Sequence, residues 1–163
     1  MKFTSILSFI PYKTAYAHCD IPCGIYDPHQ AQVAAHTVIR MTQMIGELKY
    51  EDNIQSKRQF ASQMARLTRV KEEHAEIVKH EIRVIWGDYF KEENMKGIKN
   101  LHEKVFNIMK LASTARQEAN IKAANDLLSA VQEFSEIFYK SKGLTSIRIP
   151  SGYPTGQELV SHK

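Results

Sequence analysis

Apolar residues recur every three to four positions through the middle of the chain, with charged residues between them. This spacing puts the apolar residues on one side of a helix and the charged ones on the other. Four such segments follow one another, and each predicts an amphipathic helix. Their inner positions are Ala34, Val38, Met41, Ile45 and Leu48; Met64, Leu67, His74, Ile77, Val78 and Ile85; Ile98, Leu101, Val105, Ile108 and Ala112; and Ile121, Ala124, Leu128, Val131, Phe134 and Phe138.

The ends of the helices carry recognisable signals. Asp27 before Pro28 predicts the first helix start, with Asp27 as N-cap and Gln30 completing a capping box. The second helix is expected to begin near Asp52 or Asn53 and to run to about Trp86 or beyond. Gly143 predicts the C-cap of the fourth helix.

The connections look short, near Tyr50, between Lys91 and Asn94, and between Ser113 and Gln117. Short connections favour antiparallel neighbours, and no proline interrupts the chain between Pro28 and Pro150. The predicted fold is therefore all-α: an antiparallel up-down four-helix bundle over residues 29–143.

The last segment, residues 144–163, holds two prolines and two glycines and shows no clear period. We expect it to be an irregular tail, extended or disordered.

The composition and charge of the chain limit the class of protein and the partners that it can have. The chain has 163 residues and 18.7 kDa, which suits one domain, and 43% of its residues are hydrophobic. No apolar run approaches the roughly 20 residues of a membrane span. The net charge of +4 is too small to argue for nucleic acid, because the basic residues of the second helix are interleaved with acidic ones. We expect neither a membrane nor a nucleic-acid partner.

Residues 1–17 have the features of a leader segment. The segment has one early lysine, a short apolar run and an Ala15-Tyr16-Ala17 ending, the small-x-small pattern that precedes a cut. The residues fit both a secretory signal and a propeptide removed in the cytoplasm. Either way the segment is excluded from the fold, and a cut after Ala17 makes His18 the new N-terminus.

Candidate chemistry is concentrated in residues 18–28, HCDIPCGIYDP, which hold both cysteines of the chain. Thiolates select soft or borderline metals, but two sulfurs are too few for a structural zinc site. After the cut, the free amine of His18 and the amide nitrogen of Cys19 would join the thiolates of Cys19 and Cys23. Two nitrogens and two sulfurs in a plane suit nickel(II) or copper(II), with the His18 imidazole in an axial position.

The segment HCDIPCGIYDP resembles the nickel hook of the nickel superoxide dismutase family. Trp86-Gly87-Asp88-Tyr89-Phe90-Lys91 is similar to a second stretch of that family, W-x-D-Y-F-K. The resemblance implies a four-helix bundle that assembles into a homohexamer, with one nickel ion per subunit and a dedicated protease that cuts after Ala17. It also implies that superoxide is converted to oxygen and hydrogen peroxide by Ni(II)/Ni(III) cycling. We expect the protein to be cytoplasmic.

Carried over position by position, the resemblance implies roles for seven residues. The metal ligands are His18, Cys19 and Cys23. Asp20 helps to fix the loop, Tyr26 and Tyr89 flank the open face of the metal, and Lys91 adds positive potential for an anionic substrate.

One part of the family pattern is absent. The glutamate and arginine that usually hold the axial histidine fall on Ala34 and His74 here. We expect this support to be rebuilt around His74, with His36 nearby in the sequence; His74 also fits a plain core or interface histidine.

Three other functions remain open on the residues alone: a nickel carrier, a copper carrier, and a secreted helical binding protein with a Cys19–Cys23 disulfide. Di-iron and zinc-protease sites are disfavoured, because no histidine follows a glutamate by three residues and no H-E-x-x-H motif is present.

Overall fold

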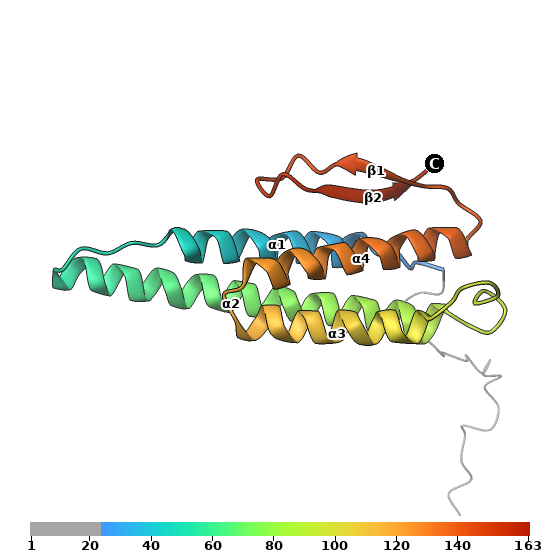
Figure 1. Cartoon of the computed structure of the whole chain (residues 1–163), viewed down its shortest axis with the longest axis horizontal. Coiled ribbons are helices and arrows are strands. Elements are labelled where there is room, and N and C mark those ends of the chain that lie inside the picture. The colour runs from blue at the N-terminus through green and yellow to red at the C-terminus, as the bar shows by residue number, and fades with distance from the viewer. Residues whose placement is uncertain (1–23) are drawn as a thin grey trace, which may run out of the picture.

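The computed structural model of the protein describes residues 24–163. The predictions for the leader and for His18, Cys19, Asp20 and Cys23 fall outside these residues. Four α-helices, a short π-helix after the second of them, and a two-stranded sheet follow one another along the described chain (Figure 1). They are α1 (His29–Glu47), α2 (Ile54–Val84), the π-helix η2 (Ile85–Tyr89), α3 (Leu101–Gln117), α4 (Ile121–Ser141), β1 (Ser146–Pro150) and β2 (Glu158–His162).

The four helices form the antiparallel bundle that the hydrophobic pattern predicts. Each helix packs against two others: α1 against α2 and α4, and α3 against α2 and α4. The core runs along the centre, and its largest fully buried side chains come from all four helices. They include Val38, Ile39, Val78, Ile82, Ile108, Leu127, Leu128, Phe134 and Phe138.

Two helix-end predictions are confirmed. The Asn53 side chain accepts a hydrogen bond from the backbone N–H of Ser56, which makes it the N-cap of α2. Gly143 has φ +73° just after α4, a left-handed conformation that glycine adopts without strain.

Three other boundary predictions are wrong. Asp27 does not cap α1 in the expected way: the helix begins at His29, Pro28 is its N-cap, and Asp27 Oδ1 accepts a bond from His29 N–H at 2.7 Å. The connection at Lys91–Asn94 extends to Asn100, so Ile98 precedes α3. Helix α3 continues through Ser113–Gln117, since the turn that ends it lies at residues 118–120.

The prediction of an irregular tail is also wrong. Strands β1 and β2 pair antiparallel, with Arg148 opposite Val160, and the hairpin lies over α1 and α4 (Figure 1). Leu159 and Val160 are buried there, 7% and 2% exposed. Its strands have five residues each, too short for a clear period in the sequence.

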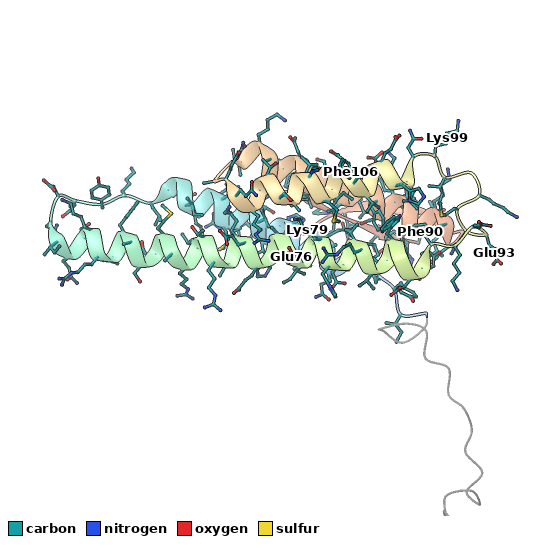
Figure 2. All side chains as sticks on the ribbon, turned by 90° about the horizontal axis from the view of Figure 1, so that it is seen from below. Glu76, Lys79, Phe90, Glu93, Lys99 and Phe106 are labelled. Carbon is teal, nitrogen blue, oxygen red and sulfur yellow. The ribbon has the colours of Figure 1, made fainter. Side chains whose placement is uncertain are left out.

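Polar contacts reinforce the seam between α2 and α3, where Figure 2 shows Glu76 and Lys79 on α2 beside α3. Lys79 Nζ donates to Ser113 Oγ at 2.8 Å, and Glu76 pairs with Arg116. The buried Lys71 ammonium donates to the carbonyls of Ala115, Arg116 and Glu118 at 2.6–2.8 Å. Lys71 therefore caps the C-terminal end of α3, where carbonyls lack helical partners and the dipole favours a cation.

Between residues 24 and 163, none of the helices is both long enough and apolar enough to cross a bilayer.

Candidate functional site

The described part of the candidate site lies at the end of the bundle where the chain enters α1. Tyr26 is buried, 8% exposed, and its ring lies 5.7 Å from that of Tyr89. Tyr89 also packs on Phe90 and Phe138, with ring centroids 5.0 and 4.8 Å away. The two tyrosines that the resemblance singles out, 63 positions apart in the sequence, thus lie side by side.

Local backbone geometry places Tyr89. At the end of α2 the backbone widens into η2, in which Phe90 N–H bonds Ile85 O, five residues back. A π-turn of this kind is rare and often marks a functional site. It lets Phe90 enter the core, 7% exposed, while the preceding Tyr89 faces Tyr26.

The hydroxyl of Tyr89 has a fixed direction. It lies 2.9 Å from Ser141 Oγ, and Ser141 donates its own hydrogen to Phe138 O at 2.6 Å. Since a hydroxyl has a single hydrogen, Tyr89 donates and Ser141 accepts. The lone pairs of the Tyr89 oxygen are then the part of this group that can accept a hydrogen bond from water.

A cation that the sequence does not reveal lies beside both tyrosines. Lys142 Nζ donates to Tyr26 O at 3.3 Å and lies above the rings of Tyr89 and Phe138, 5.6 and 4.6 Å from their centroids. Aromatic faces attract a cation at such distances. No local signal distinguishes Lys142 from the other lysines, because its partner Tyr26 lies 116 residues away.

Lys91, the cation expected from the resemblance, is exposed. Its backbone N–H bonds Asn94 Oδ1, and Asn94 in turn donates to Tyr89 O. Lys91 therefore lies two residues from Tyr89 on a loop that is tied to Tyr89.

A pocket of about 570 Å³ opens beside Tyr26 and is lined by residues of α1, α2 and η2 as well as by the segment that precedes α1. Its lining comprises Ile25, Tyr26, Asp27, His29, Gln30, Glu81, Val84 and Ile85.

The two histidines considered for the axial support lie elsewhere. His36 is covered by the hairpin: its Nδ1 lies 2.8 Å from Thr155 Oγ1 and its Nε2 3.2 Å from Glu158 O. His74 is half-buried on α2, and its Nδ1 bonds Val70 O of its own helix at 2.9 Å. At about 1.5 Å per residue, His74 lies roughly 20 Å along the helix from Tyr89, so the structure does not bring these two residues together. Ala34 is buried in the core and offers no polar group.

Within residues 24–163, no group of three or more histidine, cysteine or acidic residues could hold a metal ion. Both cysteines of the chain lie in the segment that precedes these residues. The donor set of that segment, two thiols and the nitrogens of His18 and Cys19, suits a square-planar d-block ion such as nickel(II).

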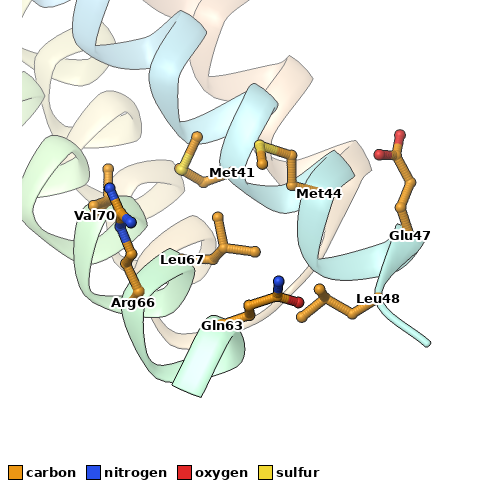
Figure 3. A pocket seen from close by; sticks show the side chains of 8 residues that line it. All are labelled: Met41, Met44, Glu47, Leu48, Gln63, Arg66, Leu67 and Val70. Atoms are coloured by element: carbon orange, nitrogen blue, oxygen red, sulfur yellow. The ribbon is translucent and has the colours of Figure 1, made fainter. Parts of the chain in front are cut away.

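A second pocket, of about 580 Å³, lies toward the opposite end of the molecule, between α1 and α2 (Figure 3). Its lining is Met41, Met44, Glu47, Leu48, Gln63, Arg66, Leu67 and Val70. It holds no tyrosine, cysteine or histidine, so its size alone does not make it a catalytic site.

Comparisons with known proteins agree with the sequence motifs. The family model described as nickel-containing superoxide dismutase matches residues 13–142, a span that includes the two-cysteine segment. A superoxide dismutase [Ni] of Streptomyces coelicolor is 33% identical over 134 residues, which is 82% of this chain and 95% of the relative. One from Streptomyces seoulensis is 31% identical with the same coverage.

Solved structures give the same result. A native structure of a nickel superoxide dismutase has a TM-score of 0.64 at 30% identity, covering 77% of this chain and 99% of the other. A crystal structure of a nickel-containing superoxide dismutase after partial X-ray-induced reduction has a TM-score of 0.65, with equal identity and coverage. The chain belongs to the nickel-containing superoxide dismutase family.

Proposed function

We propose that the chain, once cut after Ala17, converts two superoxide ions and two protons to oxygen and hydrogen peroxide at a nickel ion held by His18, Cys19 and Cys23. The observation that carries this is the match of the family model across residues 13–142, which contain these ligands and both tyrosines. Nickel, when bound, supplies the one-electron exchange with superoxide by alternating between Ni(II) and Ni(III).

The chemistry of the ligands fits that exchange. Thiolates and a deprotonated amide nitrogen are strong donors, and they stabilise the higher oxidation state of nickel. The His18 imidazole would support the same state as a further nitrogen ligand, and Asp20 would fix the loop between the two cysteines.

The described residues supply what an anionic substrate and a peroxide product need. Lys142 and Lys91 give positive potential at this end of the bundle, which draws in superoxide. Tyr26 and Tyr89 would order water beside the metal, and the lone pairs of the Tyr89 oxygen are suited to accept a hydrogen bond from such a water.

His74 remains our proposal for support of the axial imidazole. In the described part of the chain its Nε2 has no hydrogen-bond partner, which leaves this atom available. Because His74 is far from Tyr89 along α2, the contact requires the hook to run back along the bundle or to come from another copy of the chain. The second case agrees with a homohexamer, which, with the protease and a cytoplasmic location, is part of the proposal.

The test compares chain that begins at His18 with uncut chain, both loaded with nickel under reducing conditions. Superoxide decay by stopped flow and nickel content are measured together. We expect one nickel per chain and rapid turnover only in the cut form. Nickel binding without turnover would instead make the protein a metal carrier, and a Cys19–Cys23 disulfide without metal would make it a binding protein.

The variant His18→Ala keeps the terminal amine and removes the imidazole. We expect it to retain nickel and to lose most turnover. Unchanged turnover would remove the imidazole from the mechanism.

A further inference from the structure

The C-terminal end of α4 is held in one conformation by a left-handed glycine. Gly143 has φ +73°, and its N–H bonds Lys140 O at 3.0 Å. The N–H of the next residue, Leu144, bonds Tyr139 O, also at 3.0 Å. These two bonds form the Schellman motif, which ends a helix at a defined residue. The last residues before the glycine therefore have a defined place beside η2.

Ser141 lies in this last turn and contacts Tyr89 through its hydroxyl. Its own hydrogen goes to Phe138 O, 2.6 Å away and three residues back on the same helix. Serine side chains in helices often bond a carbonyl of the preceding turn in this way. The Ser141 oxygen is then an acceptor, 2.9 Å from the oxygen of Tyr89. The hydrogen of Tyr89 is thus directed at α4.

The reverse arrangement, in which Ser141 donates to Tyr89, is less favourable. It would break the 2.6 Å bond to Phe138 O, and the hydrogen of Tyr89 would lose its acceptor. Among the residues that the structure describes, Ser141 is the one hydrogen-bond partner of the Tyr89 hydroxyl. Both side chains are half-buried, so water can still reach the lone pairs of the Tyr89 oxygen.

We propose that Ser141 is a positioning residue: it takes the hydrogen of Tyr89, so that Tyr89 holds a water by accepting a hydrogen bond and keeps its own proton during the reaction with superoxide. Tyr89 is then not a source of the protons that peroxide needs. The part of the proposal that concerns the reaction rests on the proposed function. The direction of the Tyr89 hydroxyl does not depend on it.

A fixed hydroxyl has a physical advantage over a free one. A phenol that rotates freely is a donor at one moment and an acceptor at the next, so a water beside it has no constant orientation. A hydroxyl held by a side chain that is itself fixed gives the water one orientation before the substrate arrives. The ring of Tyr89 is also held, because it packs on Phe90 and Phe138.

Carbon-13 NMR on the full, metal-free chain tests the contact between Ser141 and Tyr89. Tyrosines are labelled at Cζ, whose resonance responds to the hydrogen bond of the hydroxyl, and Tyr89→Phe identifies the resonance of Tyr89. Ser141→Ala removes the acceptor, and we expect this resonance to shift. Ser141→Thr keeps a hydroxyl and should bring the resonance back toward its place in the parent. An unshifted resonance in Ser141→Ala overturns the proposal.

The matched control is Ser135→Ala. Ser135 is buried on the same helix and makes the same kind of bond, to Val131 O at 2.8 Å. Ser135→Ala should leave the resonance of Tyr89 in place. The unfolding midpoint of Ser141→Ala should lie close to that of the control, which shows that the bundle is intact in both. An equal shift of the Tyr89 resonance in the two variants contradicts a specific role for Ser141.

Turnover by the cut, nickel-loaded chain separates the two roles that Tyr89 could have. If Tyr89 acts as an acceptor, Ser141→Ala should lower turnover several-fold, as much as Tyr89→Phe does, and Ser141→Thr should restore most of it. In the Tyr89→Phe background, Ser141→Ala should add nothing. If Tyr89 supplied a proton, freeing its hydroxyl would leave turnover unchanged or raise it. That result, or full additivity in the double variant, overturns the proposal.

Failure of this proposal can be distinguished from failure of the proposed function. If the parent chain has no superoxide turnover, the proposed function fails, and the catalytic part of this proposal fails with it. The NMR result on the metal-free chain still decides whether Ser141 directs the hydroxyl of Tyr89.

Discussion

Two pockets of almost equal volume, about 570 and 580 Å³, lie toward opposite ends of this bundle, and they differ in what lines them. At the hook end, α1, α4 and η2 converge around Tyr26, Tyr89 and Lys142. Toward the other end, α2 extends beyond α3 and α4 (Figure 1). The second pocket, here called the groove, is bordered there by α1 and α2 alone (Figure 3).

The difference shows how this fold separates stability from chemistry. At the hook end aromatic rings, hydroxyls and an ammonium fix one another's directions through contacts between distant parts of the sequence. At the groove end the lining is mainly methionine and aliphatic carbon, which fills space but directs no proton or charge. Changes at the hook end should therefore alter activity, and changes at the groove end should alter stability.

The largest effect is expected at the ligands. Cys19→Ser and Cys23→Ser should each abolish superoxide turnover and nickel binding, because a serine hydroxyl does not replace a thiolate on a borderline metal. Circular dichroism should show intact helices, since the core comes from residues 26–160. A nickel-loaded serine variant with full activity would contradict the ligand assignment.

The next largest effect is expected at the groove end. Leu67 is buried, 9% exposed, where α2 meets α1. Leu67→Ala should lower the free energy of unfolding by about 2 kcal/mol, the lower end for such a truncation because the site borders an open groove. Urea unfolding measures this, and the turnover per bound nickel should equal that of the parent. A large loss of turnover at full nickel content would erase the distinction between the two ends.

Tyr89→Phe separates polar chemistry from packing at the hook end. The ring keeps its contacts with Tyr26 and Phe138, and only the bond to Ser141 Oγ is lost. We expect a loss of about 1 kcal/mol in unfolding free energy and a several-fold fall in turnover. The matched control is Tyr50→Phe: Tyr50 is 57% exposed and packs on Phe60 near the groove end. Equal turnover losses in the two variants would contradict a special role for the Tyr89 hydroxyl.

Features that depend on neighbouring residues can be predicted from this sequence, whereas features that depend on distant residues cannot. The helices follow from local rules, since a period of 3.6 residues, the Asn53 cap and Gly143 each act within a few positions. The hairpin depends on Gln32 meeting Val160 across 128 residues. Nothing local marks a glutamine on a helix as the partner of a strand, so an irregular tail is the expectation that pattern alone supports.

The candidate site divides in a similar way. Tyr26 and Tyr89 can be identified by motif, and the structure brings them together. Ser141 and Lys142 have no motif, and they join the site only because α4 ends beside η2. The ligand assignments of His18, Cys19 and Cys23 stay predictions, because they concern chemistry in residues that the structure does not describe.

The smallest effect concerns pH, and it acts through the hairpin. Burial lowers the pKa of His36 below its ordinary value of 6.5, against a smaller opposing effect of its bond to Glu158 O. The unfolded chain therefore binds a proton on His36 near pH 6.5, whereas the folded chain binds it only at a lower pH. Stability rises with pH wherever the unfolded state binds more protons, so the free energy of unfolding should fall as the pH drops through 6.5 toward the lowered value.

Urea unfolding at pH 7.5 and 5.5 measures this loss. His36→Gln removes the titrating group and keeps a donor for Glu158 O and an acceptor for Thr155 Oγ1, so its pH dependence should be weaker than that of the parent. The control His29→Gln changes an exposed histidine near the hook and should keep the pH dependence of the parent. If His36→Gln loses as much stability as the parent between the two pH values, groups elsewhere cause the acid sensitivity. If the loss disappears, protonation of His36 beneath the hairpin accounts for the sensitivity of the fold to mild acid.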